Sequence, residues 1–198
     1  MSRLAVMIMA AGQSTRFGGC KQLADVAGKP MLQRSIYTAN QLCPGNVFVV
    51  SGGWHQALTE AFEKGDLADA QLLYSDDWQH GLGNSIARGV AALAADYEGI
   101  LIMLADQVAV SASELQPFVF AYDPNHIICS LYQGRRGVPA LFPSQCFTQL
   151  QQLSGDSGAK KLLYSGAFDI VEVPLPSAAI DIDQPEELRQ FTATAVGV

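Results

Sequence analysis

Short apolar runs alternate with amphipathic stretches along most of the chain. Runs of four to six mostly apolar residues predict β-strands at residues 4–9, 46–51, 71–74, 99–104, 126–131 and 168–173. Between them, apolar residues recur at the spacing of one helix face, which predicts helices at residues 30–42, 84–95, 113–121, 144–153 and 184–191. Strands that alternate with helices in this way indicate an α/β fold.

The alternation predicts a mostly parallel sheet with helices on both faces, because parallel neighbours are joined by crossover helices. The first strands are apolar almost throughout, which suits strands that are buried on both faces. Ligands of such sheets bind beyond the carboxyl ends of the strands. We therefore expect the site to be built from the loops that follow Met9, Ser51, Tyr74 and Leu104.

Composition narrows the class of protein. The 198 residues are 49% apolar and contain no Pro/Ser-rich linker, which suits a single domain over residues 1–198. The net charge of −7 argues against a nucleic-acid-binding surface. No apolar run approaches the ~20 residues of a membrane helix, and the N-terminus has no signal-peptide pattern, so we expect a cytoplasmic protein without membrane contact.

The cysteines and histidines are dispersed along the chain. Cys20, Cys43, Cys129 and Cys146 form no CxxC pair, and the three histidines are equally scattered. Zinc sites and disulfide frameworks in small proteins show patterned spacing. We therefore expect reduced cysteines and neither kind of site.

A long glycine-rich loop, "MAAGQSTRFGGCKQL", follows the first predicted strand. Two known phosphate loops do not fit it. Ser14 stands where the dinucleotide fingerprint needs glycine, and Gly12 and Gly18 are one residue too far apart for a P-loop. A plain connection here would usually run about 2–6 residues, so the extra length indicates a function.

The chemistry of this loop suits phosphate. Gly12 would let the backbone turn and a ligand approach closely. Successive backbone amides and the hydroxyls of the Ser-Thr pair form a concavity lined with donors. Arg16 can bind two oxygens at once, and Lys21 is a compact charge. The alternative is an ordinary connection with solvated charges.

Acidic residues occupy two later segments that belong near the same edge of the sheet. Asp106 follows the strand at residues 99–104, where it is either a metal ligand or a turn residue. In "AAIDIDQPEEL", alternation places Asp181 and Asp183 on one side of an extended segment. Magnesium prefers one or two carboxylates together with phosphate and water oxygens. A magnesium site beside the phosphate loop is therefore predicted.

The glycine-rich loop, followed by "AGKPML", resembles the signature of nucleotidyltransferases with the molybdopterin nucleotidyltransferase fold. The resemblance implies a Rossmann-like single domain of the nucleotide-diphospho-sugar transferase type. It implies that Arg16 and Lys21 are catalytic and stabilise charge at the transferred phosphate. It also implies that the loop binds nucleotide through Ala10, Ala11, Gly12, Gln13 and Ser14.

The same resemblance extends to the acidic segments. "LADQ" matches the metal-holding segment of the family, although Val108 stands where proline usually follows. The resemblance implies that Asp106 and Asp183 hold Mg²⁺, or Mn²⁺ in its place, with Asp181 as the reserve ligand. Asp183 is also a good helix N-cap, so that alternative stays open.

Three further stretches resemble the cytidylyltransferase branch that acts on molybdenum cofactor. "HGLGNSIARGV" resembles its loop for base and ribose, which implies nucleotide contacts by Gly83 and Ser85, with Asn84 in place of the usual serine. "GRRGVPALF" and "LSGDSGAKKLL" resemble the acceptor side. They imply acceptor contacts by Arg135, Gly137, Pro139, Gly155 and Asp156, with further charge from Arg136, Lys160 and Lys161. The alternatives are a solvated basic face and a simple turn.

The resemblance implies transfer of CMP from CTP to the terminal phosphate of molybdopterin. Ala10-Ala11-Gly12 favours CTP over GTP. Residues 1–106 would bind nucleotide and residues 107–198 the phosphorylated pterin, with a molybdoenzyme or its chaperone as a further partner. The alternatives are a sugar phosphate or methylerythritol phosphate as acceptor, GTP as donor, or a non-catalytic carrier of the cofactor.

Overall fold

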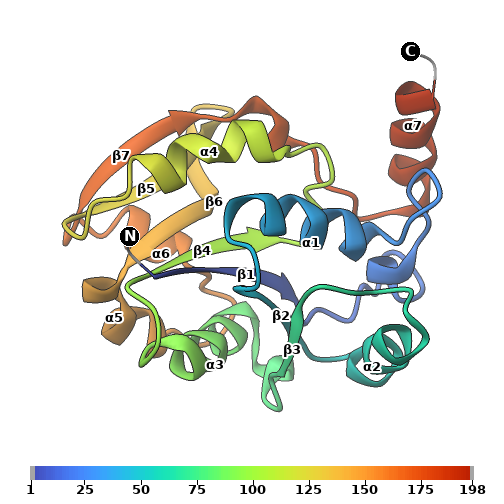
Figure 1. Cartoon of the computed structure of the whole chain (residues 1–198), viewed down its shortest axis with the longest axis horizontal. Helices are drawn as coiled ribbons and strands as arrows, with labels where there is room; N and C mark the ends of the chain where they lie inside the picture. Colours follow the sequence, from blue (N-terminus) through green and yellow to red (C-terminus); the bar gives the residue numbers. More distant parts are fainter. Residues whose placement is uncertain (1–2, 197–198) are drawn as a thin grey trace.

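The computed structural model describes residues 3–196, with side chains to residue 193. A seven-stranded sheet has the order β3-β2-β1-β4-β6-β5-β7 (Figure 1). The strands are β1 Leu4–Ala10, β2 Val47–Ser51, β3 Gln71–Tyr74, β4 Gly99–Leu104, β5 His126–Tyr132, β6 Arg135–Pro143 and β7 Asp169–Pro174. The pairs are parallel except those of β6, which runs antiparallel to β4 and β5. The predicted α/β class with a mostly parallel sheet is confirmed.

Helices cover both faces of the sheet. On one face lie α1 Met31–Leu42, α2 His55–Lys64 and α4 Ala112–Phe120, and on the other lie α3 Leu82–Leu93, α5 Phe147–Gln151 and α6 Lys160–Leu163. Figure 1 shows α1 and α4 on the side of the sheet opposite to α3 and α5. Alternate residues of β1 therefore enter different cores: Val6 and Ile8 pack on the first face, Met7 and Met9 on the second.

The remaining helical segments are short or lie at the end of the chain. They are η1 Lys21–Leu23, η2 Trp78–His80, η3 Ser144–Cys146, η4 Pro176–Ala179 and α7 Pro185–Val196. Figure 1 shows α7 standing beside the start of α1, away from the sheet. None of the helices of residues 3–196 has the length and apolar character needed to cross a bilayer.

The predicted strands all form, with bounds that differ by one residue at most at either end. β6 was missed because Gly137, Pro139 and two arginines hide its apolar alternation. The predicted helix at residues 144–153 forms instead as η3 followed by α5. Two helices, α2 and α6, were also missed: α2 buries only Leu58 and Ala61, and α6 is four residues long.

The sheet places the glycine-rich loop beside the loop that carries Asp106. β1 lies between β2 and β4, and Met9 of β1 pairs with Leu104 of β4. Both strands run in the same direction, so both loops leave the sheet at its carboxyl edge. The topology thus brings together the two segments that sequence analysis assigns to phosphate and metal.

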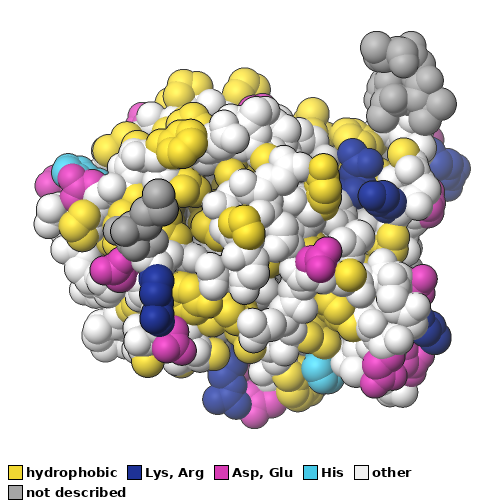
Figure 2. Space-filling model, in the orientation of Figure 1, with side chains coloured by type: hydrophobic (Ala, Val, Ile, Leu, Met, Phe, Trp, Pro, Cys, Tyr) yellow, Lys and Arg dark blue, Asp and Glu magenta, His cyan; other side chains and the backbone are white. Residues whose placement is uncertain are grey.

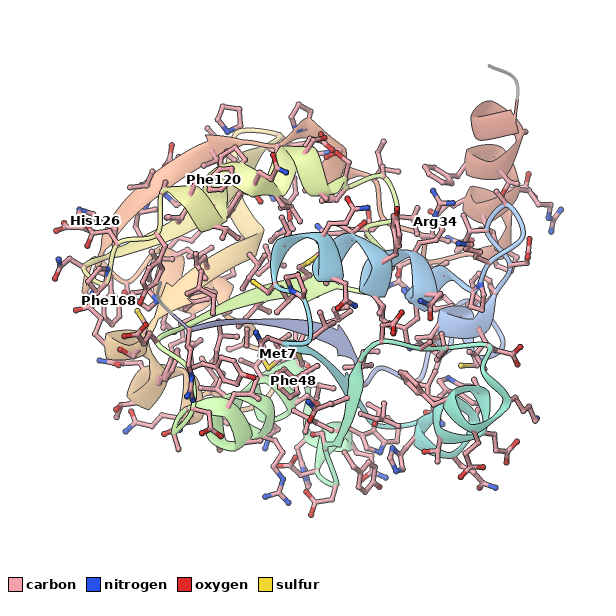
Figure 3. All side chains as sticks on the ribbon, in the orientation of Figure 1. Met7, Arg34, Phe48, Phe120, His126 and Phe168 are labelled. Atoms are coloured by element: carbon pink, nitrogen blue, oxygen red, sulfur yellow. The ribbon has the colours of Figure 1, made fainter. Side chains whose placement is uncertain are left out.

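A matched pair of phenylalanines on α4 tests how the core stabilises this arrangement. Phe118 is fully buried in the core, whereas Phe120 is 82% exposed, at the surface in Figure 3. We expect Phe118→Ala to lower the free energy of unfolding by about 3–5 kcal/mol, because a buried ring leaves a cavity. Phe120→Ala should change it by less than about 0.5 kcal/mol. Urea denaturation measures both, and equal losses would contradict the packing described.

Candidate active site

The glycine-rich loop turns sharply at two positions. Ser14 (φ 53°) and Gly18 (φ 78°) adopt the left-handed conformation, and the backbone N–H groups of Phe17 and Gly18 donate to the Ser14 carbonyl at 3.0 and 3.2 Å. Gly12, expected to supply the turn, has no positive φ. Nothing lies within 4 Å of the Cβ position at Gly12, so its face of the loop is open. The backbone nevertheless bends at Gly12, as predicted, without entering the left-handed region.

Side chains outside the predicted set hold this loop in place. Buried Gln22 donates from Nε2 to the carbonyls of Ala10 and Gly12 at 3.1 and 3.3 Å. The indole Nε1–H of Trp54 donates to the Gln13 carbonyl at 2.8 Å. Neither Gln22 nor this role of Trp54 was predicted from the sequence, because both side chains act on backbone carbonyls.

Lys21 lies at the centre of the site. Its Nζ donates to Asp106 Oδ2 at 2.7 Å, to Asp183 Oδ1 at 3.0 Å and to the Ile182 carbonyl at 3.0 Å. Arg16 pairs with the other oxygen of Asp183 at 2.8 Å. The structure thus brings together the four residues predicted to be catalytic or metal-binding.

Backbone contacts fix the acidic segments against each other. The N–H of Ile182 donates to the Asp106 carbonyl at 3.2 Å, which aligns the segment before α7 with the end of β4. Glu187 Oε2 accepts from the N–H groups of Asp183 and Gln184 at 2.7 and 2.8 Å. Glu187 therefore fixes the two residues that precede α7, and the carboxylate of Asp183 faces the cations.

The charges in the cluster stabilise one another. Partial burial disfavours the ion of Lys21, but the Asp106 charge and the hydrogen bonds outweigh it and raise the pKa of Lys21 above its usual 10.5. Burial opposes ionisation of Asp183 too, yet Lys21 and Arg16 hold the pKa of that carboxyl below 3.8. Partial desolvation and the Asp106 charge raise the pKa of Asp181, although its side chain is largely exposed. Asp181 is therefore the less favourable of the two candidate ligands.

The carboxylates fit a divalent cation that shares its shell with phosphate. Asp106 Oδ1 is buried and has no hydrogen-bond partner among the described residues. A buried carboxylate oxygen without a partner is costly, and a cation would satisfy it. Within residues 3–193, no group of three or more His, Cys, Asp or Glu side chains forms a self-sufficient metal site. Asp106 and Asp183 thus match the pattern in which phosphate and water complete the shell.

A cavity of about 320 Å³ opens onto this cluster. Its lining includes most of the residues predicted to bind nucleotide, phosphate or metal: Ala10, Ala11, Gly12, Ser14, Arg16, Lys21, Asp106 and Asp183. An adjoining cavity of about 250 Å³ shares Met9, Leu82 and Leu104 with it. The second cavity is mostly apolar and reaches β6 and the loop at residues 156–160.

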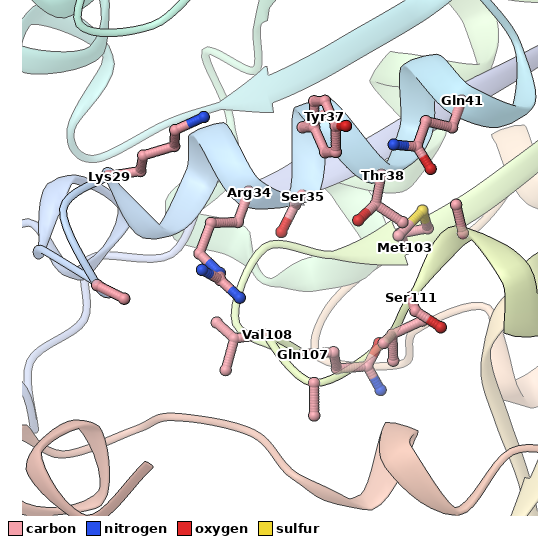
Figure 4. Close-up of a pocket in the computed structure, with 14 residues that line it drawn as sticks. Lys29, Arg34, Ser35, Tyr37, Thr38, Gln41, Met103, Gln107, Val108 and Ser111 are labelled. Carbon is pink, nitrogen blue, oxygen red and sulfur yellow. The ribbon is translucent and has the colours of Figure 1, made fainter. Parts of the chain in front are cut away.

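A third cavity, of about 420 Å³, lies elsewhere (Figure 4). It is lined by α1 and by the loop after Asp106, and its charged residues are Lys29 and Arg34. It contains none of the predicted site residues. Size alone therefore does not identify the site in this molecule.

The residues predicted to contact nucleotide after β3 make hydrogen bonds within the protein. Gly83 N–H donates to the Gly155 carbonyl at 2.8 Å, and the buried Ser85 hydroxyl is hydrogen-bonded to the Ser75 hydroxyl at 3.2 Å. Neither residue lines the cavity, nor does Gln13, whereas Leu82 of the same helix does. In the structure Gly83 and Ser85 are hydrogen-bonded within the protein, and their assignment as nucleotide contacts stays a prediction.

Some of the residues predicted to contact the acceptor line the smaller cavity, and others do not. Gly137 and Asp156 line the smaller cavity, while Arg135, Pro139 and Gly155 do not. Arg136, expected to add charge there, donates to Glu172 at 2.6 Å and to the Leu163 carbonyl at 2.8 Å, so its guanidinium is already engaged. Lys160 does line the cavity.

The cysteines lie outside this chemistry. Cys20, Cys43, Cys129 and Cys146 are all free thiols. Burial raises the pKa of Cys43 and Cys129 to about 11 and that of Cys146 to about 12. These three therefore stay neutral near pH 7 and unreactive.

On the face seen in Figure 2, Lys and Arg side chains are interspersed with Asp and Glu.

Comparison with known proteins gives one family. A model described as "MobA-like NTP transferase domain" matches residues 6–170. The purine catabolism protein PucB of Bacillus subtilis (strain 168) is 32% identical over 91% of this chain and 92% of its own length. The nicotine blue oxidoreductase of Paenarthrobacter nicotinovorans is 25% identical over 93% of this chain and 94% of its own length.

Solved structures share the whole fold. A homologue of Mycobacterium tuberculosis Rv0371c, from Mycobacterium sp. strain JC1, superimposes with a TM-score of 0.83 at 26% identity, over 98% of this chain and 97% of that one. Rv0371c of M. tuberculosis H37Rv, in complex with manganese, gives a TM-score of 0.79 over 98% of this chain and 100% of its own. At 23% identity, the second likeness shows the fold alone.

Replacing Lys21 tests the charge cluster. Lys21→Met leaves two partly buried carboxylates facing each other, and we expect the free energy of unfolding at pH 7 to fall by about 1–3 kcal/mol. Lys64→Met is the control, because the Lys64–Glu60 pair is exposed and 3.7 Å long. That change should cost less than about 0.5 kcal/mol. Equal effects of the two variants in urea denaturation would contradict the cluster's role.

The pH dependence of stability follows from the pKa shifts of Asp183 and Lys21. Asp183 has a lowered pKa, so its contribution to the free energy of unfolding is present above about pH 4. That contribution is lost as pH falls through the pKa of Asp183 in the folded protein. Lys21 has a raised pKa, so its contribution is full below pH 10.5 and is lost as pH rises through the folded value. The cost of Lys21→Met should therefore shrink below pH 4, as the carboxylates protonate. A cost that grows on acidification would contradict this sign.

Proposed function

The chain belongs to the MobA-like NTP transferase domain family, and we propose that it transfers CMP from CTP to the terminal phosphate of molybdopterin, with release of pyrophosphate. The observation that carries the proposal is the convergence of Lys21 on Asp106 and Asp183 beside the glycine-rich loop. Two cations and two carboxylates at one cavity suit the charge of a triphosphate with a divalent ion. The apolar cavity beside it suits a flat ring system as acceptor.

Positioning and charge neutralisation suffice for this reaction. The open amides of the glycine-rich loop would bind the triphosphate, and Arg16 and Lys21 would stabilise charge at the α-phosphate. The acceptor phosphate is largely ionised near neutral pH, because its second pKa is about 6, so it needs no general base. This agrees with a cavity lining that includes no histidine.

Asp106 and Asp183 would hold the divalent ion, Mg²⁺ or Mn²⁺. The ion supplies charge neutralisation of the phosphates when it is bound. Lys21 now occupies the space between the two carboxylates and would turn to the phosphates once the substrates bind. Ala11 lines the cavity, and its methyl group supports the smaller base of CTP.

Arginine replacement tests the catalytic assignment. We expect Arg16→Ala to lower the turnover number about 10²–10³-fold, because it removes a preorganised charge at the reacting phosphate. Arg88→Ala is the matched control, since Arg88 pairs with Asp76 at 2.7 Å on the exposed surface of α3. Pyrophosphate release with Mg²⁺, CTP or GTP, and each acceptor in turn measures both.

The same assay separates the alternatives. Pyrophosphate release with a sugar phosphate or methylerythritol phosphate, and not with molybdopterin, would identify that compound as the acceptor in place of molybdopterin. Tight binding of cofactor by the wild-type protein without any pyrophosphate would indicate a carrier. Turnover by Arg16→Ala equal to that of Arg88→Ala would contradict the proposed role of Arg16.

The metal ligands can be told apart by a pair of aspartates two residues apart. We expect Asp183→Asn to weaken Mn²⁺ binding in the presence of CTP at least about 10-fold, a loss typical of metal-site changes. Asp181→Asn should change it less than about threefold, because Asp181 is exposed and the carboxylates that Lys21 and Arg16 contact are those of Asp106 and Asp183. Electron paramagnetic resonance of free Mn²⁺ gives both affinities. The reverse order would make Asp181 the ligand.

A further inference from the structure

The side chain of Asn84 joins two segments that are distant in sequence. Asn84 is on the first turn of α3, where its Oδ1 accepts from the backbone N–H of Gly155 at 2.9 Å. Its Nδ2 donates to Asp77 Oδ2 at 3.1 Å. Asp77 belongs to the turn after β3, and Gly155 to the loop between α5 and α6. The side-chain amide of Asn84 therefore connects the turn after β3 to the loop between α5 and α6, whose residues 154–158 are called the acceptor loop.

The packing around this bridge is close. Gly83 N–H donates to the Gly155 carbonyl at 2.8 Å. A Cβ added to Gly81 would lie 2.3 Å from the Gly155 carbonyl carbon, and one added to Gly83 would lie 2.8 Å from the Ser157 oxygen. The backbone of the loop thus rests directly on the start of α3. An amide at position 84 supplies both the acceptor and the donor that this arrangement needs.

The far end of the bridge is fixed as well. Asp77 Oδ1 accepts from the Ser75 hydroxyl at 3.1 Å, so both oxygens of the Asp77 carboxylate are bonded. The hydrogen bond from Asn84 is the largest cause that lowers the pKa of Asp77. The carboxylate is therefore ionised and accepts from Asn84 at neutral pH. Ser75, Asp77, Asn84 and Gly155 form one continuous chain of hydrogen bonds.

We propose that Asn84 is a positioning residue that holds the acceptor loop at residues 154–158 in register with the nucleotide cavity. Asp156 and Gly158 of that loop line the apolar cavity, and Leu82, two residues before Asn84, lines both cavities. The inference rests on the proposed function, because it takes the apolar cavity to bind the acceptor. Small displacements of a bound reactant are costly in transfer reactions, so the bridge would set how accurately the acceptor phosphate is presented.

Replacing Asn84 with alanine removes both hydrogen bonds. We expect amide hydrogen exchange in the peptide that covers residues 154–158 to become about tenfold faster, because the loop loses its attachment to α3. The KM for the acceptor should rise about tenfold, with the KM for CTP changed by less than about twofold. Asn125→Ala is the control, since Asn125 bonds to Asp123 in an exposed turn.

An exchange of groups gives a sharper test that does not depend on the alanine variant. Asn84→Asp keeps the acceptor for Gly155 but places a second carboxylate against Asp77, so it should also loosen the loop. The double variant Asp77→Asn/Asn84→Asp restores a donor opposite an acceptor, and we expect it to recover wild-type exchange and acceptor KM within about threefold. Simple loss of stability would give no such rescue.

Two results would overturn the proposal. One is unchanged exchange at residues 154–158 in both Asn84→Ala and Asn84→Asp. The other is a KM for CTP that rises as much as that for the acceptor. If the wild-type protein releases no pyrophosphate with any acceptor, the proposed function fails, while the exchange measurement and its rescue still decide whether Asn84 positions the loop.

Discussion

The ammonium group of Lys21 joins segments from the beginning, the middle and the end of the chain. It donates to Asp106 after β4 and to Asp183 before α7, and it is carried by the loop that follows β1. Without a cation at this point, two partly buried carboxylates would repel each other across the carboxyl edge of the sheet. The bridge therefore both closes the structure at this edge and assembles the groups that a triphosphate needs.

The balance of charge in the cluster determines what it can bind. Arg16 and Lys21 offset Asp106 and Asp183, so the site is close to neutral although the chain carries a net charge of −7. A bound triphosphate would make it strongly negative, and a divalent ion on the carboxylates would offset part of that charge. The unpartnered oxygen of Asp106 is the group that such an ion would satisfy. Phosphate and metal sites are thus interdependent.

The sequence could single out residues whose expected role follows from their position directly after a predicted strand. Arg16, Lys21 and Asp106 follow strands at the edge where ligands bind, and the resemblance of their loops to a nucleotidyltransferase family is confirmed. The contacts of Gln22, Trp54 and Asn84 were not predicted, because each side chain bonds to a backbone group that no sequence pattern marks. Such pairings depend on strand register and loop packing, which no local pattern encodes.

β6 shows the same limit in the fold. Gly137 and Pro139 interrupt its apolar pattern, yet it fills the place between β4 and β5 and makes the sheet mixed. The need for a strand at this place is visible only in the assembled sheet, where β4 and β5 would otherwise each lack a neighbour on that side. Similarly, the motif that contains Gly83 gives no sign of the loop at residues 154–157 that packs against this glycine.

Diffraction from crystals soaked with CTP and Mn²⁺, with the ion located by its anomalous signal, tests the central assignment most directly. The account predicts the ion on Asp106 and Asp183, the triphosphate along the glycine-rich loop, and Lys21 within hydrogen-bond distance of a phosphate oxygen. An ion held elsewhere, or a triphosphate bound away from Lys21 with its bridge to both carboxylates intact, would contradict it.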